Sequence, residues 1–316
     1  GEGRLRLDGH STSSRTSRAV FGLNSSDARN YAGRPGEPYF LPAAMKAAGY
    51  TTRVLVAHSN QVERGIDGGY DEVDRTLEAD MRGPYGSNAG AVTARAIQTI
   101  EAHRAKSSTP LFLWVHYFDP HSPYVDPPGN PLALKRRDVE RYAAEVARAD
   151  RAVGDLAAYL RSISPQVGSL LFMTADHGEE LGEKHAYVRP TTYHGQSLNE
   201  PVVRIPMLAW SPTPPATEPL QEMPRSLADV APFLVAVVAG SPFRASQHVF
   251  FAIDTTFDQL VGLYDEGWKL VLHRRTNLVT LYDLKSDPFE LNNLAPTQPQ
   301  RVQQLGEALG SYMLPR

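Results

Sequence analysis

The residues best suited to chemistry in this sequence are an acid and an imidazole that follow an apolar segment. Asp176 and His177 come directly after GSLLFMTA (168–175), and Gly178 and Glu179 follow them. In an open α/β sheet, ligands collect at the carboxyl ends of the strands. A carboxylate oxygen beside an imidazole nitrogen suits a divalent cation that polarises an anionic ester. The pattern favours a metal site, and the alternative is a helix-capping acid beside a surface histidine.

A second imidazole stands at the far end of the same polar loop. His194 lies in YHGQSLNE (193–200), directly before the apolar segment VVRIPMLAW (202–210). A polar loop between two apolar segments of strand length predicts a buried strand on each side of it. Strands of a sheet must therefore position this loop.

A hydroxyl-rich segment, HSTSSRTS (10–17), runs into SRAVFGL (17–23) near the start of the chain. The pattern predicts a turn followed by a short helix, because Ser and Thr are natural helix caps. From the residues alone, capping is the simplest interpretation of these hydroxyls.

Apolar strands and amphipathic helices alternate over the first 240 residues. A nearly continuous apolar run at 110–118 predicts a central strand buried on both faces, and we interpret His116 within it as a core or wall histidine. This alternation predicts an α/β sandwich with a mainly parallel sheet. The other patterns predict a strand at 51–60 and helices at 41–50, 89–106, 135–162 and 226–240, the last stopped by Gly240.

The last part of the chain changes character. Short apolar segments separated by turn residues predict a small antiparallel sheet followed by a polar helix. We therefore predict two domains, at 1–240 and 241–316. The segments are HVFFAID (248–254), WKLVLH (268–273), LVTLYDL (278–284) and, for the helix, QPQRVQQLGEAL (298–309).

Composition limits the classes of function. A net charge of −3 excludes the strongly basic surface of a nucleic-acid-binding protein. The absence of cysteine excludes disulfides and thiolate metal sites. No apolar run approaches the length of a membrane span, and no basic-then-apolar signal segment opens the chain. An anionic substrate must therefore be held by local Arg, His or metal.

Several ordered motifs resemble the sulfatase family of the alkaline-phosphatase superfamily. They are DHGE (176–179), GE (182–183), HG (194–195) and RIP (204–206) before a strand, and LYDLKSDPFELNNLA (281–295) is similar to the family's carboxyl-terminal signature. The resemblance implies an alkaline-phosphatase-like α/β/α sandwich with a small carboxyl-terminal antiparallel sheet. We interpret the Asp and Asn residues of that signature as turn formers.

The segment from Ser14 to Ala19 resembles the family's nucleophile motif of Cys or Ser, any residue, Pro, Ser and Arg. The resemblance implies that Ser14 is the nucleophile and that Arg18 steadies it and the bound oxyanion. Thr16 stands where Pro is usual, and Ser14 stands where most members carry the Cys that is oxidised to formylglycine. Formylglycine at Ser14 is one prediction, and an unmodified hydroxyl activated by a metal is the other. Thr12 and Thr16 are rival nucleophiles, because several registers fit this run.

The resemblance also implies residues that contact the substrate. His121, in HYFDPHSPY (116–124), is expected to contact the transferring group or to protonate the leaving oxygen, and His58 to bind substrate. His194 is expected to neutralise substrate charge together with Arg18. Many relatives have Lys at the position of His194, so a second metal ligand is the alternative for this imidazole.

The resemblance implies a divalent cation held by Asp176 and His177. We expect Ca²⁺, with Mn²⁺, Mg²⁺ or Zn²⁺ as alternatives. Family members add two adjacent Asp ligands on a first strand, but Asp8 is the sole Asp before Ser14 and no apolar strand is predicted there. We therefore expect a chain that lacks this strand and binds metal weakly. We also expect a bacterial protein, periplasmic or anchored outside the cytoplasm by a membrane segment beyond this sequence.

The leading hypothesis is a metal-dependent sulfuric ester hydrolase that acts on a small-molecule or glycan sulfate ester. One alternative is a phosphoryl hydrolase or transferase of the same superfamily, such as a phosphodiesterase, a phosphonate monoester hydrolase or a phosphoethanolamine transferase. Another is a catalytically inactive sulfatase-like binding module. Nucleic-acid partners are not expected, and the sequence makes no prediction of oligomeric state.

Overall fold

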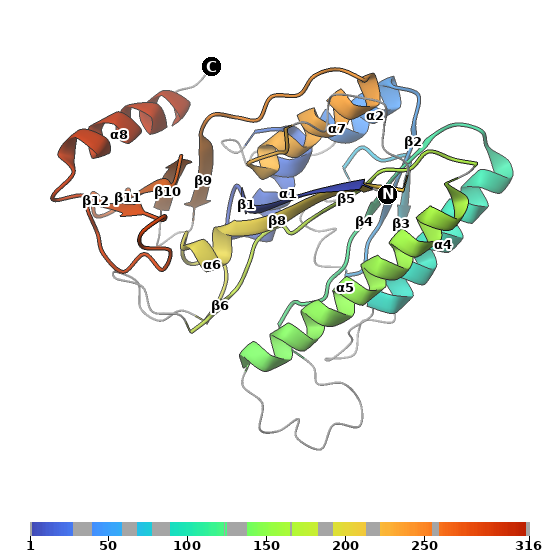
Figure 1. The fold of residues 1–316 in the computed structure, drawn as a ribbon, viewed down its shortest axis with the longest axis horizontal. Helices are drawn as coiled ribbons and strands as arrows, with labels where there is room; N and C mark the ends of the chain where they lie inside the picture. The colour runs from blue at the N-terminus through green and yellow to red at the C-terminus, as the bar shows by residue number, and fades with distance from the viewer. Residues whose placement is uncertain are drawn as a thin grey trace. The chain divides into compact units, whose positions relative to one another are not determined.

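The structure is a computed structural model of the 316-residue chain (Figure 1). The chain divides into two compact units, each of which is described by itself. The first unit contains residues 1–2, 35–171 and 210–216, and the second contains residues 3–34, 172–209 and 217–316. The residues described are 2–27, 40–58, 68–77, 89–122, 124, 138–164, 166–182, 192–212, 222–254 and 259–313. Among them, no helix combines the length and the apolar character needed to cross a membrane.

The first unit contains a parallel three-stranded sheet covered by long helices. Its strands lie in the order β3 (Glu72–Asp74), β2 (Thr51–Leu55) and β4 (Leu111–Val115). Figure 1 shows the two longest helices, α4 (Ala89–Lys106) and α5 (Asp138–Ile163), packed side by side. The predicted helices and strands of this unit are thus confirmed, including α2 (Phe40–Ala47), which packs against β2.

The burial predicted for the strand around β4 is wrong. All five residues of Leu111–Val115 are half-buried, whereas a continuous apolar run suggested full burial on both faces. The fully buried side chains of this core come from the neighbouring strand and the helices, because amphipathic helices place one apolar face on the sheet. They are Leu55, Ala57, Val92, Ala96, Leu156, Leu160 and Ile163.

A second three-stranded sheet has the order β1 (Glu2–His10), β8 (Arg204–Ser211) and β5 (Leu171–Thr174). The sequence did not predict β1, because its apolar residues Leu5 and Leu7 alternate with arginines. In the structure these two leucines are 59% and 61% exposed. Burial along β8 alternates, with one face in the core. β5 is half-buried, although a buried strand was predicted.

Short elements surround this sheet in the second unit. Gly240 ends α7 (Val230–Ala239) in the left-handed conformation, at φ +62°, as the sequence predicted. The hairpin of β6 (Glu180–Leu181) and β7 (Thr192–Tyr193) is antiparallel. The helices are α1 (Thr16–Ser25), α6 (Glu200–Val203), the 3-10 turn η4 (Leu227–Asp229) and α7 (Val230–Ala239).

The carboxyl-terminal part forms the predicted small antiparallel sheet. Its order is β12 (Leu278–Asp283), β11 (Trp268–His273), β10 (Gln259–Asp265) and β9 (Val249–Asp254), and α8 (Pro299–Met313) packs on it. The sequence did not predict β10. At its Gly262, a Cβ atom would lie 2.2 Å from the Phe251 ring, so the sheet requires the residue that weakens the strand pattern. The boundary at residue 240 stays a prediction.

Candidate active site

Asp176 and His177 follow β5, as the sequence predicted, and their side chains converge. Oδ2 of Asp176 lies 3.3 Å from Nε2 of His177, and Oδ1 accepts a hydrogen bond of 2.9 Å from the backbone N–H of His177. The side chain of Asp176 is 36% exposed, whereas that of His177 is 7% exposed. The carboxylate is therefore open to a ligand, and the imidazole is fixed beside it.

Of the three candidate nucleophiles, Thr16 contacts this pair. Its Oγ1 lies 3.0 Å from Nε2 of His177. The Ser14 hydroxyl is fully buried and has no hydrogen-bond partner within the described part of the chain. Thr12 packs against α1. A Cβ atom added to Gly22 of that helix would lie 2.4 Å from the Thr12 hydroxyl. The hydroxyl that contacts His177 is therefore that of Thr16, a rival candidate, and not that of Ser14, which the resemblance implied as the nucleophile.

Thr16 is also the first residue of α1. The residue before the helix is Arg15, and no side chain caps the helix there, so the capping role predicted for these hydroxyls is wrong at the helix start. The first N–H groups of a helix attract anions, because the helix dipole is positive at that end. Arg18, the predicted oxyanion partner, lies in the first turn of α1 and is half-buried. This helix end therefore suits an anionic ester.

His194 lies against His177, with ring centroids 4.2 Å apart. Its Nδ1 lies 3.0 Å from Oε1 of Glu179, whose side chain is only 6% exposed. The β6–β7 hairpin explains this contact, because Glu179 directly precedes β6 and His194 directly follows β7. No role was predicted for Glu179 from the sequence, although its position in the DHGE motif, before a loop that contains a histidine, was a signal.

Two glycines of the loop stand where a side chain would not fit, one because of a close backbone contact and the other because of its backbone conformation. At Gly178, a Cβ atom would lie 2.1 Å from the carbonyl oxygen of Pro201. Gly195 has φ +85°, and its carbonyl oxygen accepts a 3.2 Å hydrogen bond from Nε of Arg15. Glu180 is buried, and its Oε1 accepts hydrogen bonds from the side chains of Ser197 and Asn199. The DHG and HG motifs are thus required by geometry as well as by chemistry.

The two other predicted substrate histidines belong to the first unit. His58 and His121 both stack on the Phe118 ring, with centroid distances of 4.1 and 4.5 Å. The structure thus brings His58 and His121 together, and it brings Asp176, His177 and His194 together in the second unit. The roles of His58 and His121 stay predictions. His116 is half-buried, and its backbone N–H donates to the Leu55 carbonyl.

Asp176 and His177 fit a shared divalent cation in chemistry, because an oxygen and an imidazole nitrogen converge beside a hydroxyl. In the described part of the chain, no group of three or more His, Asp or Glu side chains is placed to hold a metal ion. A hard cation such as Ca²⁺ takes about six to eight oxygen ligands. The two side chains alone would supply only a small part of such a coordination shell. Asp8 is exposed in β1 and pairs with Arg6 at 3.1 Å.

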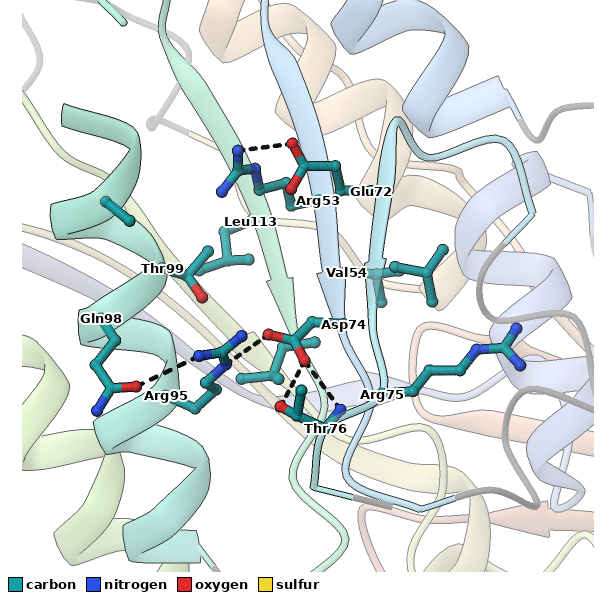
Figure 2. Close-up of a pocket in the computed structure, with 13 residues that line it drawn as sticks. Arg53, Val54, Glu72, Asp74, Arg75, Thr76, Arg95, Gln98, Thr99 and Leu113 are labelled. Atoms are coloured by element: carbon teal, nitrogen blue, oxygen red, sulfur yellow. Dashed lines mark hydrogen bonds and ion pairs between the residues drawn. The ribbon is translucent and has the colours of Figure 1, made fainter. Parts of the chain in front are cut away.

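A cavity of about 350 Å³ in the first unit is lined by charged residues of β2, β3 and α4 (Figure 2). These charges pair with one another, since Arg95 lies 2.6 Å from Asp74 and Arg53 lies 2.7 Å from Glu72. Burial raises the pKa of the Asp74 carboxyl, but hydrogen bonds from Thr76 and Arg95 hold that pKa below its ordinary value. None of the predicted site residues lines this cavity.

Comparison with known proteins identifies the family. The family model described as Sulfatase matches residues 2–241, which is most of the chain, and the chain therefore belongs to the sulfatase family. This confirms the resemblance inferred from the DHGE and HG motifs.

Curated relatives match over part of their length. The chain is 27% identical over 178 residues to choline-sulfatase of Rhizobium meliloti (strain 1021), covering 51% of this chain and 33% of that protein. It is 25% identical over 232 residues to arylsulfatase K of Xenopus laevis, covering 63% of this chain and 42% of that protein. The chain thus spans less than half the length of these relatives.

The fold is also shared with solved structures. One is a protein in complex with its substrate D-glucosamine-2-N,6-O-disulfate, with a TM-score of 0.71 and 14% identity, covering 96% of this chain and 90% of that one. The predicted alkaline-phosphatase-like α/β fold with a small antiparallel sheet is thereby confirmed.

Proposed function

We propose that this sulfatase-family chain hydrolyses sulfate esters. The observation that carries the proposal is the Thr16 hydroxyl, 3.0 Å from Nε2 of His177 at the start of α1. In the proposed reaction, Oγ1 of Thr16 attacks sulfur, the bond from sulfur to the alcohol oxygen breaks, and the alcohol leaves with a proton. Water then cleaves the sulfate ester formed on Thr16 and releases inorganic sulfate.

Asp176 and His177 are the proposed ligands of a divalent cation. When bound, such a cation lowers the pKa of a neighbouring hydroxyl and polarises an ester oxygen. We propose Ca²⁺ as the ion. The alternatives are Mn²⁺ and Mg²⁺, which suit the carboxylate ligand, and Zn²⁺, which suits the imidazole ligand.

The remaining roles follow from charge. Arg18 and His194 are proposed to neutralise the sulfate oxygens, and Glu179 keeps His194 oriented by accepting from its Nδ1. His121 is proposed to protonate the leaving alcohol, and His58 to bind the alcohol portion.

Ser14 is the rival nucleophile, through conversion to formylglycine. Mass spectrometry of the peptide that contains residues 11–18 distinguishes the two chemistries. An unmodified Ser14 together with sulfate release supports Thr16, whereas an aldehyde at Ser14 transfers the role to that residue.

The substrate class is proposed from the relatives. A solved structure of this fold holds a disulfated glucosamine, and a curated relative is a choline-sulfatase. We propose a small-molecule or glycan sulfate ester as the substrate of this chain.

The experiment compares p-nitrophenyl sulfate with p-nitrophenyl phosphate, after chelation and after addition of each cation in turn. We expect cation-dependent release of p-nitrophenol from the sulfate ester. Turnover of the phosphate ester alone would contradict the proposal in favour of phosphoryl transfer. Absence of turnover, together with no increase in melting temperature on cation addition, would indicate a binding module, because a ligand of the native state stabilises it.

A further inference from the structure

A buried cluster of ionisable side chains lies beside the proposed catalytic residues. The Lys269 ammonium is 0% exposed and contacts two carboxylates, at 2.8 Å from Glu200 and 2.9 Å from Glu290. Nε2 of His10 lies 3.2 Å from the Glu200 carboxylate, and the Tyr264 ring packs on the His10 ring at 4.3 Å. No role was predicted for any of these residues from the sequence, although a lysine between apolar residues in WKLVLH was a signal.

Glu200 and Lys269 carry opposite charges at neutral pH. Burial alone would raise the pKa of the Glu200 carboxyl, but Lys269 and His10 hold that pKa below its ordinary value. Burial alone would lower the pKa of the Lys269 ammonium, but Glu200 and Glu290 raise it. Buried ion pairs add little net stability compared with apolar residues of the same volume, because desolvation opposes the attraction. Stability is therefore a weak explanation for this cluster.

The cluster fixes the short helix α6. Glu200 is the first residue of α6, and its side chain accepts from Lys269. Its backbone N–H donates to Oε2 of Glu290 at 2.7 Å. Glu290 belongs to the carboxyl-terminal signature of the chain, and it is 1% exposed with φ +55°. The Glu290 carboxylate thus bonds both the first backbone N–H of α6 and Lys269, the residue that neutralises the Glu200 side chain.

Helix α6 in turn holds both halves of the proposed active site by main-chain hydrogen bonds. The backbone N–H of Ser11 donates to the Val203 carbonyl at 2.7 Å, and that of Gly178 donates to the Val202 carbonyl at 2.7 Å. The Ser11 hydroxyl donates directly to the main-chain oxygen of Asp176. The nucleophile segment, which contains Ser11 and Thr16, and the metal-binding loop, which contains Asp176 and Gly178, are therefore both hydrogen-bonded to α6.

We propose that His10, Glu200, Lys269 and Glu290 are positioning residues that set the distance between the nucleophile segment and the metal-binding loop through α6. His10 directly precedes Ser11, so the cluster contacts the nucleophile segment both through α6 and through its own imidazole. The expected effect on catalysis rests on the proposed function. The expected effect on the distance between the two segments does not.

Hydrogen exchange measured at single amides tests the inference. The variant Glu290→Gln keeps the shape of the side chain and removes its charge, and Glu145→Gln is the matched control. Glu145 is equally buried, at 3% exposed, and pairs with Arg148 at 3.0 Å within α5 of the first unit. We expect about tenfold faster exchange of the Ser11 and Gly178 amides in Glu290→Gln only, because local opening tracks local stability.

Amides of the β10–β11 ladder, such as Leu263 and Leu270, provide the internal reference. Unchanged exchange at Ser11 and Gly178 would overturn the inference, and so would an equal acceleration at the reference amides, which indicates general loosening. Should Glu290→Gln not fold, His10→Asn leaves both lysine pairs intact and is measured at the same amides with the same expected result.

Kinetics supply a second measurement. In Glu290→Gln, kcat at saturating ester and cation is expected to fall about tenfold, as for outer-shell partners of metal ligands, with KM within twofold of wild type. Faster exchange of the two amides in a protein whose wild type turns over no sulfate ester would retain the positioning inference and reject the proposed function. Normal kcat with normal exchange would reject the positioning inference alone.

Discussion

Two imidazole–carboxylate pairs in the second unit have nearly the same separation and opposite surroundings. His177 lies 3.3 Å from Asp176, and His10 lies 3.2 Å from Glu200. The Asp176 side chain is 36% exposed and has a threonine hydroxyl beside its histidine, whereas the Glu200 side chain is 9% exposed and is closed by Lys269. The same two functional groups therefore form a candidate metal site in one place and a closed charge cluster in the other.

The groups that surround each pair decide what the pair can do. The Lys269 ammonium already compensates the negative charge of the Glu200 carboxylate, so no metal cation is required there. The carboxylate of Asp176 lies open to solvent beside the His177 imidazole, where a divalent cation would add positive charge. Four predictions test this difference.

The largest effect is expected at Thr16. Thr16→Val removes the hydroxyl and keeps the shape, so kcat for a sulfate ester should fall about 10⁴-fold, as for loss of a nucleophile. Thr16→Ser should restore much of the activity. Ser14→Ala and Thr12→Val are the controls, and each should cost less than about tenfold in kcat. A larger loss in Ser14→Ala than in Thr16→Val would make Ser14 the nucleophile.

Asp176→Asn should lower kcat/KM by roughly a thousandfold, because metal assistance contributes several kcal/mol and each 1.36 kcal/mol is tenfold in rate. The increase in melting temperature on cation addition should also disappear. His116→Ala is the control and should lower stability while it keeps the cation-induced increase. An equal loss of that increase in both variants would remove Asp176 from the proposed ligand set.

Lys269→Met should destabilise the fold without removing a catalytic group. Two buried carboxylates would lose their shared counter-charge, so the free energy of unfolding should fall by about 3–5 kcal/mol. Urea denaturation measures this change. The triple variant Lys269→Met, Glu200→Gln, Glu290→Gln should recover part of the loss. If Lys269→Met alone were as stable as wild type, the charged form of Lys269 in the folded protein would be contradicted.

The smallest effect is a dependence of stability on pH at both extremes. Glu200 has a folded-state pKa below its ordinary 4.5, so its contribution to stability is complete above about 4.5 and is lost as pH falls further. Lys269 has a folded-state pKa above its ordinary 10.5, so its contribution is complete below about 10.5 and is lost as pH rises further. The triple variant should show smaller decreases in melting temperature at both extremes, and decreases equal to those of wild type would contradict the assignment.

Local patterns predicted much of the fold. Helical periodicity predicted α4 and α5, and short apolar segments separated by turn residues predicted β11 and β12. β1 and β10 were missed, because exposed leucines between arginines and a glycine within an apolar run both weaken a strand pattern. Full burial of β4 and β5 was predicted from apolar composition, which shows that a side chain is apolar but not how completely its neighbours cover it.

The sequence by itself determined the family and the acid–imidazole pair, since DHGE, HG and the carboxyl-terminal signature are local patterns that can be read along the chain. Only the tertiary structure decided which hydroxyl contacts His177 and gave Glu290 a partner. The physical reason is distance along the chain, because Thr16 and His177 are 161 residues apart and His10 and Glu200 are 190 residues apart. Contacts between such residues depend on how strands and helices pack, and no spacing within a motif encodes them.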